Sequence, residues 1–252
     1  MNEFRKLMLV ALMSGTLAGL VWFAAQYVAV IPLIERAEVY ESAAHHDADE
    51  GWHPRDGWQR SSFTAAATVL TGIALAAILF GIASLADQRV DAKKGLLWGL
   101  AGFACFSLAP ALGLPPQPPG AAVADLFSRQ LWWTSTIVAT AVGIYLIARS
   151  RSWQLKIGGI ACIALPHVIG APAPAGESVV PIQLMRQFIF ASLGASALFW
   201  MTLGIVGGLI YRGLIYHRSA GGKTLDTPEK DASAQKIDRR SCAETRAHPI
   251  TL

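Results

Sequence analysis

The sequence predicts an all-α integral membrane protein, a bundle of six transmembrane helices with five as the alternative count. Hydrophobic residues make up 53% of its 252 residues and charged residues only 15%, and the mean hydropathy is +0.41. A soluble domain carries about 25% charged residues. Several uncharged runs are also long enough to cross a hydrocarbon layer of about 30 Å. Composition and run length therefore indicate a multi-pass membrane protein.

Six apolar runs give the predicted spans. The first, residues 7–34, is longer than the apolar region of a typical secretory signal peptide, so we expect a retained helix. The fifth, residues 155–171, is short and interrupted by Pro166, so it either crosses the bilayer or forms a re-entrant segment. That choice separates six spans from five, and we expect six. The remaining spans are residues 63–86, 95–114, 131–148 and 188–211.

Glycines four residues apart occur in three of these runs. This GxxxG spacing lets the backbone of another helix approach closely. We therefore expect close helix packing at Gly15 and Gly19, at Gly95 and Gly99, and at Gly204 and Gly208.

The distribution of lysine and arginine predicts the orientation. Of the 21 basic residues, 16 lie in one alternating set of termini and connections, residues 1–6, 87–94, 149–156 and 212–252. By the positive-inside rule this set faces the cytoplasm, which places both termini there.

Three regions follow from the spans and the orientation. Residues 1–217 form the transmembrane helical domain. Residues 35–62 within it form an outer loop rich in acidic residues and histidine. Residues 218–252 are polar and lack apolar periodicity, so we expect a disordered cytoplasmic tail.

The predicted outer loop concentrates side chains that bind metal ions. Residues 38–53 contain five acids and three of the six histidines. Carboxylates and imidazoles together suit first-row divalent metals such as cobalt, nickel, zinc or iron. No fixed motif such as HExxH is present, so a solvated acidic loop without a ligand role is the alternative. If the first helix continues beyond the membrane, three candidate ligands share one face and the rest follow: Glu38, Glu41 and His45, then His46, Asp47 and His53.

His167 is the second candidate, because it is the only histidine within an apolar run. An ionisable side chain in a span indicates a functional site by default. Pro166 precedes it and removes the hydrogen-bonding partner of the carbonyl four residues earlier. His167 therefore either provides a step for a cation or hydrogen-bonds a neighbouring helix near the outer interface.

The segment before the fourth span predicts a structured loop. Its prolines forbid a helix and favour a rigid extended chain. Asp125 and Arg129 are four residues apart and could pair as the next helix begins. Trp132 and Trp133 are placed as anchors at the membrane interface.

Several function classes are disfavoured. There is no Walker A, GxSxG, HExxH or glycine-rich dinucleotide motif, so we do not expect an enzyme. The basic residues are scattered rather than forming a stripe, which argues against nucleic acid as a partner. Cys105, Cys162 and Cys242 imply no disulfide framework. No acid lies inside any predicted span, so either a second protein or a homo-oligomer completes the path for a divalent ion, or this chain is not the permease.

Four segments in a fixed order carry a resemblance to a known family. They are WFAAQYVAVIPLIERAEVYE, followed by the loop with acids and histidines, then LGLPPQPPGAAVADLFSRQLWW, ALPHVIGAP and VVPIQLMRQFIFASLGASALFW. Together they resemble the CbtA family of proposed cobalt transporter subunits. The resemblance implies cobalt uptake across a bacterial inner membrane, linked to cobalamin metabolism. It also implies a small one-span partner, CbtB, with a histidine-rich terminus, and it favours five spans.

The expected function is therefore an inner-membrane subunit of a cobalt uptake transporter, with nickel as the alternative metal. The outer-loop ligands would collect the ion and His167 would pass it on. Cobalt is the expected substrate, and no permanently bound cofactor is expected. The expected partners are the lipid bilayer and either a CbtB-like protein or a second copy of the chain. A structural or regulatory membrane protein without transport activity is the alternative.

Overall fold

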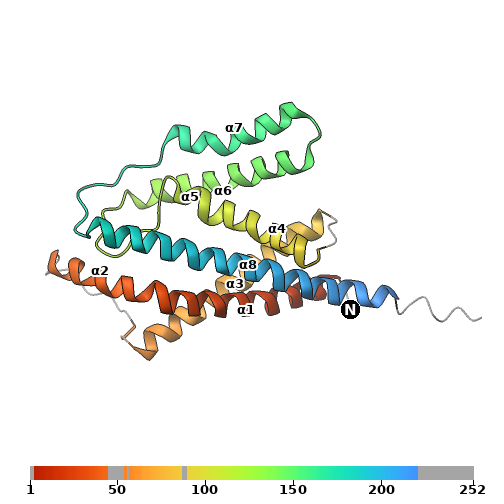
Figure 1. The fold of residues 1–252 in the computed structure, drawn as a ribbon, viewed down its shortest axis with the longest axis horizontal. Helices are drawn as coiled ribbons and strands as arrows, with labels where there is room; N and C mark the ends of the chain where they lie inside the picture. The colour runs from red at the N-terminus through yellow and green to blue at the C-terminus, as the bar shows by residue number, and fades with distance from the viewer. Residues whose placement is uncertain (1–2, 45–53, 56, 87–89, 221–252) are drawn as a thin grey trace, which may run out of the picture. The chain divides into compact units, whose positions relative to one another are not determined.

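The computed structural model describes residues 3–44, 54–55, 57–86 and 90–220, and every regular element within these ranges is helical. The predicted all-α fold is therefore confirmed (Figure 1). The elements are α1 (Glu3–Ala29), α2 (Ile31–Ala44), α3 (Trp58–Leu85), α4 (Ala92–Phe103), the π-helix η1 (Ala104–Leu108), α5 (Ala109–Ala111), α6 (Leu126–Arg149), α7 (Trp153–Ile169) and α8 (Ile182–Ala220).

The chain divides into two compact units, Met1–Arg212 and Gly213–Leu252. The first unit contains the helical bundle. Of the second unit, the described part is the end of α8, which stays helical to Ala220. The helix thus continues three residues into the predicted tail, and residues 221–252 of that tail lie outside the described residues.

Five helical stretches are long and apolar enough to cross a membrane: Glu3–Ala29, Trp58–Leu85, Ala92–Ala111, Leu126–Arg149 and Ile182–Leu214. The chain is therefore a multi-pass membrane protein in contact with the lipid bilayer. The shorter apolar helix α7 has 17 residues, which at 1.5 Å per residue gives about 26 Å. This length is at the lower limit for a span.

Helix α7 packs antiparallel to α6 along its length (Figure 1). At one end, Trp132 of α6 hydrogen-bonds the carbonyl of Pro166, and further along Gly143 lies against Gly159. An added Cβ on Gly159 would lie 2.8 Å from the Gly143 carbonyl oxygen, so the two backbones touch there. The hairpin returns the chain to the end of the bundle where α6 began.

Helix α8 contacts α1, α4 and η1. Gly204 faces Gly95 and Gly99 of α4 so closely that no Cβ would fit, which confirms the packing expected from the GxxxG spacing. Phe199 contacts Trp22 of α1 with the ring centroids 4.8 Å apart and the ring planes tilted by 34°. The Ser196 hydroxyl hydrogen-bonds that of Ser107 in η1 at 2.6 Å.

Helices α1 and α3 form the second close pair. An added Cβ on Gly19 would lie 2.7 Å from Val69 Cα, and one on Gly15 would lie 2.6 Å from the Ile73 nitrogen. Gly72 of α3 lies against Gly15 and Gly19 in the same contact. The glycines predicted at 15 and 19 therefore lie at a backbone contact.

The π-helix η1 interrupts the third span. The Ala109 N–H donates to the carbonyl of Ala104, five residues back, and Pro110 has no N–H to donate. This wide turn directs Phe106 toward Trp133 of α6 and Trp200 of α8, at centroid distances of 6.4 and 5.5 Å. With Phe199 and Trp22 these rings form a continuous chain of aromatic contacts from α6 to α1.

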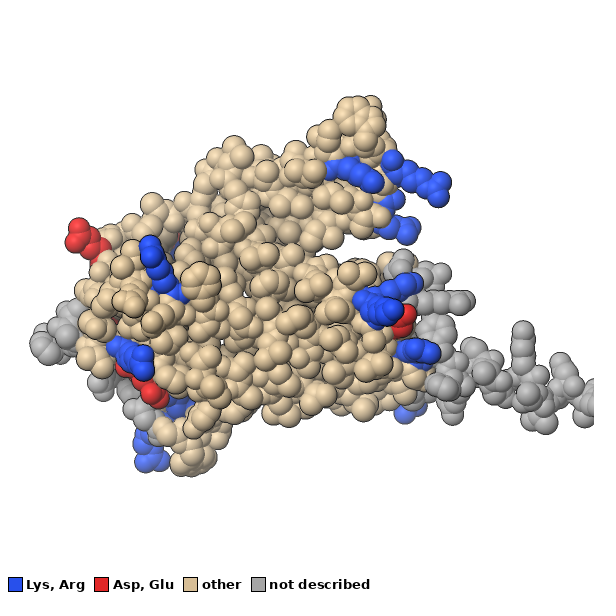
Figure 2. Space-filling model, viewed as in Figure 1, with Lys and Arg blue, Asp and Glu red and all other residues tan. Residues whose placement is uncertain are grey.

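Charged side chains lie at the two ends of the bundle (Figure 2). One end is mostly basic, where α4 begins, α6 ends and α7 begins. The other end carries both signs. This distribution agrees with the orientation predicted from the connecting segments, with the basic end in the cytoplasm.

Candidate functional site

The end of the bundle opposite the basic end, called the outer end because the predicted orientation places it outside, begins where α1 passes into α2. Only Val30 separates the two helices, and its N–H still donates to the Gln26 carbonyl at 2.8 Å. Val30 is buried with Phe188 and Ala195 of α8, and Leu33 packs against this cluster. The expected continuation of the helix beyond the first span is therefore confirmed as far as Ala44.

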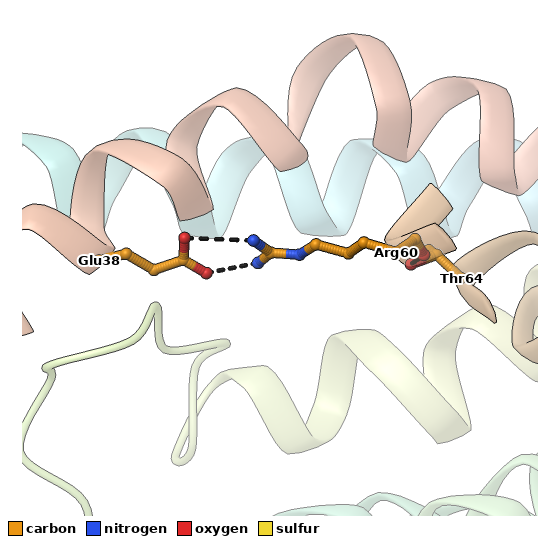
Figure 3. A network of polar contacts seen from close by, with 3 residues as sticks. All are labelled: Glu38, Arg60 and Thr64. Carbon is orange, nitrogen blue, oxygen red and sulfur yellow. Dashed lines mark hydrogen bonds and ion pairs between the residues drawn. The ribbon is translucent and has the colours of Figure 1, made fainter. Parts of the chain in front are cut away.

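Glu38 of α2 is paired with Arg60 of α3 (Figure 3). Both carboxylate oxygens accept from the guanidinium, one of them at 3.2 Å from Arg60 Nη1. The side chains are 37% and 33% exposed. The Thr64 hydroxyl donates to the Arg60 carbonyl at 2.9 Å. A carboxylate held in this bidentate way is neutralised by a cation of the protein itself. The metal-ligand role expected for Glu38 stays a prediction.

Glu41 lies one turn further along α2 and is exposed. The proline-rich loop meets α2 here, because an added Cβ on Gly120 would lie 3.3 Å from Glu41 Cβ. Gly120 has φ of +74°, a left-handed conformation that favours glycine. Within the described ranges nothing hydrogen-bonds the Glu41 carboxylate, so it remains available on the outer end.

The other candidate ligands of the loop, His45, His46, Asp47 and His53, lie outside the described residues. Among the residues that are described, no three His, Cys, Asp or Glu side chains come close enough to hold a metal ion. Of the two candidate carboxylates on α2, Glu38 is therefore bound to Arg60 and Glu41 is exposed.

His167 lies in the last turn of α7, against Trp132 of α6. The two rings meet edge to face with centroids 5.7 Å apart. The cross-helix hydrogen bond is made by the indole instead, from Trp132 Nε1 to the Pro166 carbonyl at 3.2 Å. His167 Nε2 is buried, and no described residue hydrogen-bonds to it. Of the two alternatives for His167, a hydrogen bond to a neighbouring helix is not made by Nε2 among the described residues, and the ring meets α6 edge to face.

Asp125 caps the N-terminus of α6. Its carboxylate accepts from the Ser128 N–H at 3.0 Å and from the Ser128 hydroxyl at 3.2 Å. These bonds, the backbone one first, hold the pKa of Asp125 below its ordinary value. The pairing expected between Asp125 and Arg129 was wrong, because a cap satisfies the otherwise unpaired N–H groups of the first turn.

The outer end also has two grooves that sequence reasoning missed. One lies between the proline-rich loop and the start of α6 and is lined by Arg129 and Trp133. The other lies between α2 and the start of α8 and is lined by Arg36 and Gln187. The prolines and tryptophans of this segment predicted a structured loop at the membrane interface. Neither residue type indicates that the loop leaves a groove beside α6.

The comparisons with known proteins identify a family. Searches of curated proteins and of solved structures found no match. Residues 4–212 match the family described as "Probable cobalt transporter subunit (CbtA)". This range covers the bundle from α1 into α8 and includes the outer-end residues described above. Transporter subunits are not an enzyme class, and the term subunit implies a partner. The chain belongs to the CbtA family of probable cobalt transporter subunits.

Proposed function

We propose that this chain collects divalent cobalt, with nickel as a second substrate, on the outer face of a bacterial inner membrane. The proposal assigns two stages to the outer end of the bundle. Glu41 at the end of α2 attracts the ion together with the predicted ligands of residues 45–53, and His167 accepts it at the open end of the α6–α7 hairpin. Family membership supports the metal, and the orientation of charge supports the side.

The observation that carries the proposal is the buried Nε2 atom of His167 without a hydrogen-bonding partner in the described part of the chain. Leaving a buried polar atom unpaired costs roughly 1–3 kcal/mol. Such an atom calls for an explanation, and a passing ion or water is one. Neutral imidazole nitrogen is also a common ligand of cobalt-like metals.

The collecting stage uses Glu41 together with His45, His46, Asp47 and His53. Glu38 takes a different part in the proposal: its pair with Arg60 fixes the end of α2 from which the ligands start. A divalent ion crossing inward gains about 4.6 kcal/mol at a membrane potential of 100 mV, from 2.3 kcal/mol per charge. The potential alone can therefore concentrate a scarce metal once a path exists.

A partner completes the ligand set in this proposal. The described residues bring no three metal-binding side chains together, and one imidazole cannot replace the hydration shell of a divalent ion. A small one-span protein with histidines, similar to CbtB, would supply the missing ligands. A second copy of this chain is the other arrangement.

The test is accumulation of radioactive cobalt in bacterial cells that lack their own cobalt uptake system. Cells would express the chain alone or with a histidine-bearing one-span partner. The variants are His167→Ala with Val168→Ala as its exposed neighbour control, and Glu41→Gln with Glu35→Gln as the control on the same helix. We expect the His167 and Glu41 variants to lower uptake and the two controls to leave it unchanged.

Two outcomes contradict the proposal. Unchanged uptake after His167→Ala, and after combined replacement of His45, His46 and His53 by alanine, removes both stages. Absence of uptake in every combination, with both proteins present in the membrane, favours the structural or regulatory alternative. Competition by unlabelled nickel then decides whether the second metal shares the route.

A further inference from the structure

The groove beside the start of α6 has a polar end and an apolar end. Its volume is about 390 Å³. Arg129, Gln130 and Gln117 supply the polar groups, whereas Leu114, Val123 and Trp133 supply apolar surface. Arg129 and Trp133 are one helical turn apart on α6, so the groove changes from polar to apolar within about 6 Å along the helix.

Arg129 is half-buried in this groove and has no acidic partner among the residues described. The ion pairs among the described residues join Lys6 to Glu3 and Arg60 to Glu38. The nearest acid in sequence, Asp125, is engaged by Ser128. A guanidinium presents a planar fork of donors that matches phosphate oxygens, and it keeps its charge at every physiological pH. The polar end of the groove therefore suits an anion.

Apolar side chains beside the groove are exposed, as on a surface that meets lipid. Leu126, Phe127 and Leu131, on the same part of α6, are 58–74% exposed, and Trp133 is 37% exposed. Tryptophan is typical of the level at which lipid headgroups meet the hydrocarbon. The site thus offers a cation at headgroup depth and apolar surface below it, which is the arrangement an amphiphilic anion requires.

We propose that this groove binds the headgroup of an anionic phospholipid from the outer leaflet, with its phosphate on Arg129. Gln117 and Gln130 provide further donors, although one N–H of Gln117 already binds the Ala122 carbonyl at 3.1 Å. None of the residues that line the groove is acidic, so nothing there attracts the ammonium group of a zwitterionic lipid. The positive groove also disfavours a divalent metal, which separates this site from the cobalt ligands.

Native mass spectrometry of the purified full chain tests the proposal. The protein in detergent is titrated with phosphatidylglycerol or with phosphatidylcholine, and bound lipid is counted. We expect Arg129→Gln to weaken phosphatidylglycerol binding about fivefold, the effect of removing one basic residue near a headgroup. Arg55→Gln removes an exposed charge at the same end outside the groove and is expected to leave binding unchanged. Arg129→Lys keeps the charge and should fall between the wild type and Arg129→Gln.

Three results would overturn the proposal. Wild-type affinity of Arg129→Gln for phosphatidylglycerol rules out the contact, and equal binding of phosphatidylcholine rules out selection for an anion. Displacement of the lipid by inorganic phosphate at equal concentration makes the groove a site for free anions. Circular dichroism and size exclusion show whether the variants fold. If Arg129→Gln does not fold, the lipid affinity of Arg129→Lys and the comparison of the two lipids on the wild type still test the proposal. The measurement needs no cobalt, so its outcome is independent of the transport proposal.

Discussion

Separating the Glu38–Arg60 pair should destabilise the bundle, because the pair joins the end of α2 to the start of α3. Two unit charges about 4 Å apart attract by about 4 kcal/mol at an effective dielectric constant of about 20. Each side chain is about one-third exposed, so solvent screening and the ordering of two long side chains oppose this attraction. We expect a coupling free energy of about 1 kcal/mol, at the upper end of values for exposed pairs because the geometry is bidentate.

A double-mutant cycle measures this coupling directly. Unfolding free energies of the purified protein in mixed micelles are compared for the wild type, Glu38→Gln, Arg60→Gln and the double variant. The loss in the double variant should be smaller than the sum of the single losses by about 1 kcal/mol. Glu41→Gln, an exposed acid on the same helix, serves as the control and should change stability by less than about 0.5 kcal/mol.

Cobalt uptake by the same variants shows whether Glu38 acts by holding Arg60 or by binding the metal. If Glu38 acts through Arg60, exchanging the two charges in Glu38→Arg with Arg60→Glu should restore both stability and uptake. Additive stability losses, with a coupling near zero, would refute the pairing. Uptake abolished by Glu38→Gln at unchanged stability would instead return Glu38 to the metal ligands.

Three further predictions concern the scaffold. Gly19→Ala should destabilise the protein by roughly 1–3 kcal/mol, because its Cβ would lie 2.7 Å from Val69 Cα, whereas Gly81→Ala, with no atom within 4 Å, should be neutral or stabilising in the same unfolding assay. Asp125 has a lowered pKa in the folded chain, so its contribution to stability is present above the ordinary value of 3.8 and is lost as pH falls through the folded pKa. Asp125→Asn should flatten this part of the stability profile, and an unchanged slope between wild type and variant would contradict the cap. Ser107→Ala and Ser196→Ala should each cost about 0.6 kcal/mol, and the double variant should cost less than their sum, because one hydroxyl bond joins them.

The fold was largely predictable because membrane helices follow from local sequence. An uncharged run must satisfy its own backbone in lipid, so run length alone indicates a helix. Gly95 and Gly204 could likewise be assigned to a helix contact, since small residues at this spacing serve few other purposes in a span. The π-helix was not predicted. Pro110 signals a break, but the extra residue in the turn depends on how Phe106 packs between α6 and α8.

The candidate site was less predictable because it depends on contacts distant in sequence. Glu38 and Glu41 have the same chemistry and share a helix face, yet only Glu38 meets an arginine, 22 residues further along the chain. Asp125 illustrates a choice between two local rules: helix spacing favoured Arg129, but the first turn needed a cap, and Ser128 took the carboxylate. His167 was found because a histidine in an apolar run is rare, whereas its contact with Trp132 depends on the α6–α7 packing. The ligand roles of His45, His46, Asp47 and His53 stay predictions.

The bond between Glu38 and Arg60 also has an evolutionary consequence. It closes the ends of the segment between α2 and α3, so the bundle depends on where that segment starts and stops. The entropic contribution to the free energy of closing a flexible loop rises by only about 0.6 kcal/mol when the loop doubles in length. Insertions, deletions and exchanges of histidine or acid within residues 45–53 are therefore inexpensive for folding. Under the ligand roles proposed for this segment, metal preference can therefore change there while the fold of the bundle stays the same.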